Sequence, residues 1–258
     1  MSTSTSKGTT TTDLVVYADF TCPECYLAVR RADVLAAAGV PVDVRAVEHL
    51  PELPAASRRL TDADRNELTE RFDALGSLLL SGETLPWSMP PVRPRSQAAV
   101  SAYAETYASP VAVDVRRLLF ELYWREGADI GNPTVLRTPL AGAVLRSGVT
   151  ADPLWQSGYA VAMTGGPVTT AAYRRIRSWR DEWRDLGGPP LPIVLSDGAT
   201  LHGIDAVRRL GKQITYTGVD LAPEVDDPRR YPSVDNRPPR GWVSEIGNRW
   251  RTSYRLGD

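Results

Sequence analysis

Two hydrophobic periods dominate the first fifty residues. Leu14 to Asp19 is a short apolar run rich in valine, and Val42 to Val47 alternates apolar and polar side chains, so both segments are predicted strands. The stretch between them, Cys22 to Ala38, is rich in alanine and leucine and ends before Gly39, which predicts a helix. The order strand, helix, strand indicates one right-handed βαβ unit with parallel strands.

A helical pattern then runs from about residue 62 to residue 186, interrupted by a proline-rich loop at residues 85–94. Its clearest mark is an apolar stripe with the period of a helix. The members of that stripe are Val115, Leu118, Leu119, Leu122 and Tyr123. Further helices are predicted at residues 97–108, 133–145, 152–163 and 168–186.

Strand signals return only near the end of the chain. Pro190 to Leu195 and Ala199 to His202 are predicted strands, joined by a hairpin turn at residues 196–198. A helix is predicted from Ile204 to Leu210, and beyond about residue 218 no period is clear.

This order predicts an α/β fold in which a helical domain is inserted between a βαβ half and a ββα half. The predicted boundaries are a disordered tail at 1–12, the first half at 13–60, the inserted helical domain at 61–165, the second half at 166–212 and a C-terminal extension at 213–258.

Composition narrows the classes of function. The 258 residues carry 30 Lys and Arg against 31 Asp and Glu, a net charge of −1. The sequence therefore has no excess of positive charge that would favour binding to nucleic acid or to an anionic membrane. No apolar run is long enough to cross a bilayer, and the polar N-terminus lacks the apolar core of a secretory signal. We therefore expect a cytoplasmic protein with neither nucleic-acid nor membrane partners.

The arginine-rich segment at residues 173–184 fits the same expectation. Its apolar side chains Tyr173, Ile176, Trp179 and Trp183 fall at the spacing of a buried helix face, with the arginines on the other side. A solvated helix is the better interpretation than a nucleic-acid contact.

The candidate chemistry lies in the segment FTCPECY, which holds both cysteines of the chain. In a reducing cytosol such a pair is more often catalytic or metal-binding than structural. Pro23 suits the first position of a helix, so Cys22 lies at the helix start and Cys25 one turn further on the same face. Their Cα atoms are expected about 5–6 Å apart, within reach of a disulfide.

The helix start also favours a thiolate at Cys22, because unpaired N–H groups and the positive end of the helix dipole face it. Cys22 is therefore the predicted attacking sulfur and Cys25 the resolving one. Glu24, between them, should disfavour a second negative charge and make the pair less oxidising.

Other interpretations of these residues stay open. The cysteines could be two buried apolar thiols. A zinc site would need four ligands, and the chain offers only His49 and His202 besides the cysteines, at a spacing that is not that of a known zinc finger, so no metal is expected. His49 is interpreted as a surface or loop residue and His202 as structural. Asp19 is either an exposed carboxylate at a strand end or a group that raises the pKa of Cys22 or relays protons to it.

The segments VVYADFTCPECYLAV and LPIVLSDGATLHGIDAV, with the helical insertion beginning PVRPRSQAAVSAY between them, resemble the DsbA-like branch of the thioredoxin fold. More narrowly, they are similar to its cytosolic FrnE and 2-hydroxychromene-2-carboxylate isomerase type. The resemblance covers roughly residues 14 to 212.

The resemblance implies a thioredoxin fold and a thiol–disulfide oxidoreductase that needs no bound cofactor. It implies Cys22 as nucleophile, Cys25 as resolving thiol and a cis-proline at Pro192, with Leu191 offering its backbone to an extended substrate. Tyr26 matches an aromatic residue common after the second cysteine. The implied partner is a protein or low-molecular-weight thiol or disulfide. Two alternatives remain: an isomerase or transferase that uses a glutathione-like thiol, and a non-enzymatic binding module.

Overall fold

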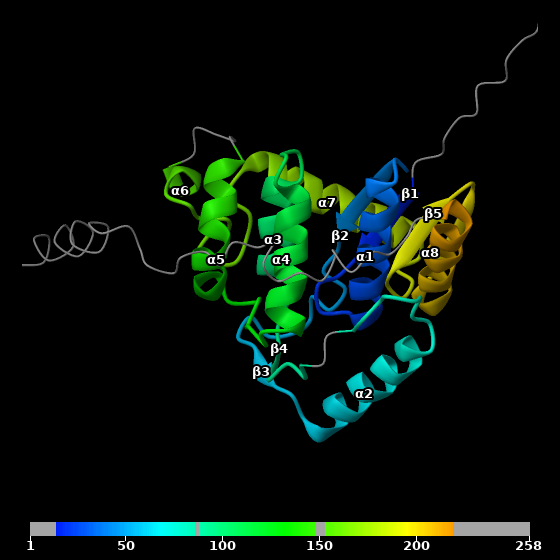
Figure 1. Cartoon of the computed structure of the whole chain (residues 1–258). Coiled ribbons are helices and arrows are strands. Elements are labelled where there is room, and N and C mark those ends of the chain that lie inside the picture. The colour runs from blue at the N-terminus through cyan, green and yellow to red at the C-terminus, as the bar shows by residue number, and fades with distance from the viewer. Residues whose placement is uncertain (1–13, 86–87, 148–152, 219–258) are drawn as a thin grey trace, which may run out of the picture. The chain divides into compact units, whose positions relative to one another are not determined.

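A four-stranded mixed sheet organises the structure, a computed structural model that describes residues 14–85, 88–147 and 153–218. The strand order is β2-β1-β5-β6, with bounds Leu14–Ala18 for β1, Val42–Ala46 for β2, Ile193–Ser196 for β5 and Ala199–His202 for β6. β1 pairs with β2 in parallel and with β5 antiparallel, and β5 and β6 form the hairpin. The predicted βαβ and ββα halves thus share one sheet (Figure 1).

Two helices of these halves, α1 (Pro23–Ala37) and α8 (Gly203–Thr217), pack against each other. They lie next to each other in Figure 1, with α8 beside β5. α8 is longer than the predicted helix because its pattern of buried side chains continues past Leu210 to Ile214.

The middle of the chain forms the helical block. Its members are α3 (Gln97–Thr106), α4 (Ala112–Trp124), α5 (Pro133–Arg146), the short α6 (Pro153–Gln156) and α7 (Thr170–Asp185). α7 contacts both α3 and β2, so it connects the block to the sheet.

Two details of the helical block differ from the sequence analysis. The helix predicted at 152–163 is only the single turn α6, because Gly158 adopts a left-handed φ of 78° and ends it. Tyr173, predicted to be buried, is 56% exposed, whereas Trp179 on the same helix is buried as expected.

The region before α3 holds a small ribbon that the sequence did not predict. β3 (Arg58–Arg59) pairs with β4 (Val92–Arg93), and α2 (Asp62–Gly76) runs between them in the sequence. Asp64 fixes the start of α2, where it forms a capping box with Thr61 and pairs with arginines of both strands. This arrangement secures α2 at its N-terminal end.

The predicted tail at 1–12 and all of the predicted extension beyond residue 218 lie outside the described residues. Within the described part, no helix has both the length and the apolar character needed to cross a membrane.

Candidate active site

Cys22 is the N-cap of α1. The chain leaves β1 at Ala18 and turns, with the N–H of Cys22 donating to the Asp19 carbonyl at 3.2 Å. Cys22 itself is extended (φ −102°, ψ 120°), and Pro23 occupies the first helical turn, where its missing N–H leaves no bond unmade. The Cys22 sulfur accepts the N–H of Cys25 at 3.4 Å. The predicted position of this sulfur at the helix start is therefore confirmed.

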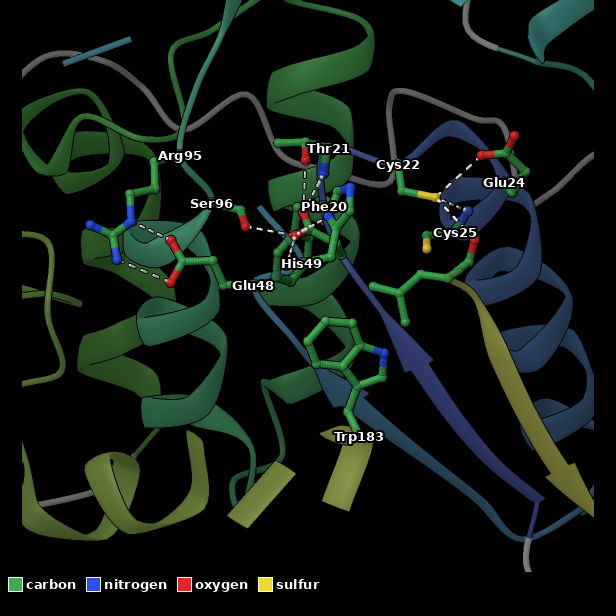
Figure 2. A network of polar contacts seen from close by, with 12 residues as sticks. Phe20, Thr21, Cys22, Glu24, Cys25, Glu48, His49, Arg95, Ser96 and Trp183 are labelled. Carbon is green, nitrogen blue, oxygen red and sulfur yellow. Dashed lines mark hydrogen bonds and ion pairs between the residues drawn. The ribbon is translucent and has the colours of Figure 1, made fainter. Parts of the chain in front are cut away.

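The Cys22 sulfur lies among polar groups although it is almost fully buried, with 2% of the residue exposed. Its S–H faces Glu24 Oε2 at 3.3 Å and the Leu191 carbonyl oxygen at 3.7 Å. Figure 2 shows the sulfur turned toward Glu24 and Cys25 at the start of α1. Both cysteines are free thiols.

Leu191 and Pro192 reach the site from the start of β5. The peptide bond between them is cis, as the resemblance implied for Pro192. This segment is buried, and the carbonyl of Pro192 is occupied by the N–H of Gly203 at 2.8 Å. Cys22 and Leu191 are 169 residues apart in sequence. The pairing of β1 with β5 therefore places a backbone carbonyl from the second half of the fold next to the sulfur of the first half.

Cys25 lies deeper, with no exposed surface. Burial raises the pKa of its thiol well above the usual range, and the neighbouring Cys22 raises it further. At neutral pH Cys25 is therefore a protonated thiol.

Arg71 of α2 completes the surroundings of Cys22, a contact that was not predicted from the sequence. Its guanidinium forms a two-point ion pair with Glu24, with Nε 2.9 Å from Oε1 and Nη2 in contact with Oε2. The same Nη2 lies 3.6 Å from the Cys22 sulfur. Burial alone would raise the pKa of Glu24, but Arg71 holds it below its usual value. Glu24 is thus an ionised carboxylate whose charge is balanced by Arg71, and not the unpaired carboxylate expected from the sequence.

A second polar cluster lies just after the end of β1, to one side of the cysteines in Figure 2. Asp19 is 1% exposed, so its interpretation as an exposed strand-end residue is wrong. Its carboxylate accepts hydrogen bonds from Thr21, from Ser96 and from the backbone and ring of His49. Thr21, His49 and Ser96 converge on this point in Figure 2. His49 is accordingly the ion-pair partner of a buried acid, while His202 is exposed at the end of β6.

Aromatic side chains tie the site to the helical block. The Trp124 indole N–H of α4 donates to the Phe20 carbonyl at 3.0 Å, and the Phe20 ring lies 4.9 Å from that of Phe120. Tyr26 packs edge-on against Phe120 as well. The turn that carries Cys22 is therefore held by α4. Among the described residues, no group of three or more His, Cys, Asp or Glu side chains is arranged to hold a metal ion.

No family model and no curated protein sequence matches the chain. Solved structures do match it. A probable DsbA oxidoreductase from Streptomyces coelicolor aligns with a TM-score of 0.55 at 16% identity, covering 80% of this chain and 90% of that one. The cytosolic disulfide reductase DsbM from Pseudomonas aeruginosa aligns with a TM-score of 0.53 at 19% identity, covering 80% and 95%. Its structure with GSH aligns with a TM-score of 0.51 at 18% identity, covering 80% and 96%.

At these identities the similarity concerns the fold, and it agrees with the sheet order and the inserted helices described above. The chain therefore has the DsbA-like form of the thioredoxin fold.

Proposed function

We propose that the protein is a thiol–disulfide oxidoreductase that works through Cys22 and Cys25. The observation that carries the proposal is the position of the Cys22 sulfur. It caps α1, accepts the Cys25 N–H and lies against the carbonyl that precedes the cis-proline. N–H donors and the helix dipole stabilise a thiolate there, and the thiolate is the reactive form in disulfide exchange.

The exchange runs in two steps. The Cys22 thiolate attacks one sulfur of a substrate disulfide, so the substrate S–S bond breaks, a mixed disulfide forms and the other substrate sulfur leaves as a thiolate. Cys25 then gives up its proton, which the first substrate thiolate accepts, and attacks the Cys22 sulfur. This attack forms the Cys22–Cys25 disulfide and releases the second substrate thiolate. Two electrons pass from the cysteine pair to the substrate, and the reverse sequence oxidises a dithiol.

The substrate that we propose is a protein or a low-molecular-weight thiol or disulfide, with Leu191 and Pro192 as its docking segment. An extended peptide could align along the backbone of this segment, in the manner of strand addition. The similarity to a cytosolic disulfide reductase that has been solved with GSH supports the smaller substrate and a cytoplasmic location.

The test is reduction of insulin and of glutathione disulfide by the full chain, compared with C22S and C25S. We expect C22S to abolish both reactions and C25S to accumulate a mixed disulfide at Cys22, detected by mass spectrometry. C25S is the matched control, because it removes the same atom one helical turn away yet leaves the attacking sulfur. Unchanged turnover in C22S would refute the assignment.

A further inference from the structure

Arg71 connects α2 to the start of α1. It projects from α2, and Glu24 and Cys22 belong to the start of α1. The Arg71 side chain is 28% exposed and that of Glu24 is 10% exposed, so their ion pair is largely screened from solvent. α2 brings this charge to the sulfur by packing its apolar face inward. Phe72, the next residue, stacks edge-on against Trp124 with ring centroids 5.3 Å apart.

The two charges next to Cys22 act on its sulfur in opposite directions. The Glu24 carboxylate lies 3.3 Å from the sulfur and disfavours a thiolate there, while the Arg71 guanidinium lies 3.6 Å away and favours one. The distances are nearly equal, so neither effect dominates by proximity. Without Arg71, the first helical turn would hold a buried carboxylate against the sulfur that has to ionise.

The other titratable groups near the sulfur leave this role to Arg71. From α1, the neutral thiol of Cys25 faces it. On α2, Glu67 lies 3.4 Å from Nη1 of Arg71 and so touches the far side of the guanidinium. Asp19 and His49 pair with each other. Among the groups within hydrogen-bond distance of the Cys22 sulfur, only Arg71 carries positive charge in the described structure.

We propose that Arg71 is a further catalytic residue, the counter-ion that cancels Glu24 and stabilises the Cys22 thiolate. This inference rests on the proposed exchange function and extends it to a residue of α2. When Cys22 ionises, its S–H contact with Glu24 is lost and the N–H groups of Arg71 and Cys25 remain as donors.

The test measures the alkylation rate of Cys22 by iodoacetamide from pH 4 to pH 10, in a C25A background so that a single thiol reacts. The plateau rate at high pH reports access to the sulfur, and the midpoint of the profile reports its ionisation. We expect R71Q to raise the midpoint by about one unit and E24Q to lower it by about one unit, which is a tenfold change in thiolate at a fixed pH. The double variant should return toward the parent.

Opposite signs are the decisive result, because loss of structure in both variants would move both midpoints the same way. R65Q makes the same charge change on the exposed face of α2 and should leave the midpoint unchanged. R71K keeps the charge without the two-point geometry and should fall between the parent and R71Q. If R71Q fails to fold, the proposal is judged from the midpoints of E24Q, which should be lower than that of the parent, and of R71K, which should be higher. Equal midpoints in R71Q and R65Q, or shifts of the same sign in R71Q and E24Q, would overturn the proposal.

The reduction potential gives an independent check. Stabilising the thiolate stabilises the reduced form, so with both cysteines present E24Q should be more oxidising than R71Q, by about 30 mV for each tenfold difference. If the parent exchanges disulfides and C22S does not, but the midpoints stay fixed, this inference fails and the proposed function stands. If the parent exchanges nothing while the midpoints move as expected, the proposed function fails, and Arg71 is a counter-ion to a thiol that exchanges no disulfide, not a catalytic residue.

Discussion

Oδ2 of Asp19 lies 2.8 Å from Nδ1 of His49, and the same oxygen accepts the backbone N–H of His49 at 3.0 Å. The Asp19 side chain is 1% exposed and that of His49 is 23% exposed. Burial alone would raise the pKa of Asp19 and lower that of His49. Their mutual attraction outweighs burial in both cases, so the pKa of Asp19 is lowered and that of His49 is raised. A charged pair therefore supports the turn that leads to Cys22.

This pair should give the stability of the protein a defined pH dependence. The pKa of His49 is raised on folding, so its contribution is complete below its usual value of about 6.5 and is lost as the pH rises through the folded value. The pKa of Asp19 is lowered, so its contribution is complete above about pH 4 and is lost as the pH falls through the folded value. The pair should stabilise the fold most between these limits.

We expect H49Q to reduce the free energy of unfolding by about 2 kcal/mol near pH 6 and by less at pH 9, because the contribution of the charged histidine falls as the pH rises through its raised pKa. Urea denaturation at both pH values measures this. H202Q is the matched control, because that histidine is exposed, and its effect should be small at both pH values. An H49Q effect that is equal at pH 6 and pH 9 would mean that His49 is not a charged partner of Asp19.

A second prediction concerns the resolving thiol. Cys25 is fully buried and the pKa of its thiol is raised, first by burial and then by Cys22. Native reduced protein at pH 8 should therefore incorporate iodoacetamide at Cys22 alone, as read by peptide mass spectrometry. In urea both cysteines should react. Modification of Cys25 at a rate similar to Cys22 in the native protein would contradict the order of attack proposed above.

The raised pKa of the Cys25 thiol also agrees with the proposed order of the two exchange steps. One of its causes is the charge of Cys22, and that charge is absent once Cys22 is held in a mixed disulfide. Cys25 then becomes easier to deprotonate at the step that requires its thiolate. The thiol thus remains protonated before substrate binds.

Local sequence signals predicted the frame of the site well. The position of Cys22 could be predicted because a strand run, a helix-starting proline and a helical pattern follow one another within a few residues. The predicted cis-proline at Pro192 depended on the resemblance to DsbA-like proteins, and it is confirmed. The parallel pairing of β1 with β2 and the β5–β6 hairpin follow from similarly short-range patterns.

The charged surroundings of the site could not be predicted in the same way. Arg71 is 47 residues from Glu24, and Ser96 is 77 residues from Asp19. No helical or strand period relates residues at such separations. The one available signal for Arg71 was its place beside Phe72 on the apolar edge of α2, which shows that it borders a buried surface but not which one. Contacts of this kind depend on how the chain packs, so the Asp19–His49 pair was missed as well.

The last prediction concerns the contact between α1 and α8. A Cβ atom added at Gly211 of α8 would lie 2.7 Å from Nη1 of Arg31 and 3.1 Å from its Cζ. Arg31 is 1% exposed, and its guanidinium is held by Glu83 and by the carbonyls of Leu78 and Val207. The guanidinium cannot move aside without breaking those bonds, so only a glycine fits at this position.

Helix propensity and packing therefore make opposite predictions for G211A. In a helix interior, alanine is favoured over glycine by about 1 kcal/mol, whereas forcing extra atoms into a packed contact typically costs about 1–3 kcal/mol. We expect packing to dominate, so that G211A lowers the free energy of unfolding by about 1 kcal/mol in urea denaturation. G76A at the end of α2 is the control, because no atom lies within 4 Å of the added Cβ. It should leave stability unchanged or raise it. Equal gains in both variants would show that the Arg31 guanidinium can shift to admit the added methyl group, and the packing of α1 against α8 would then not require glycine at this position.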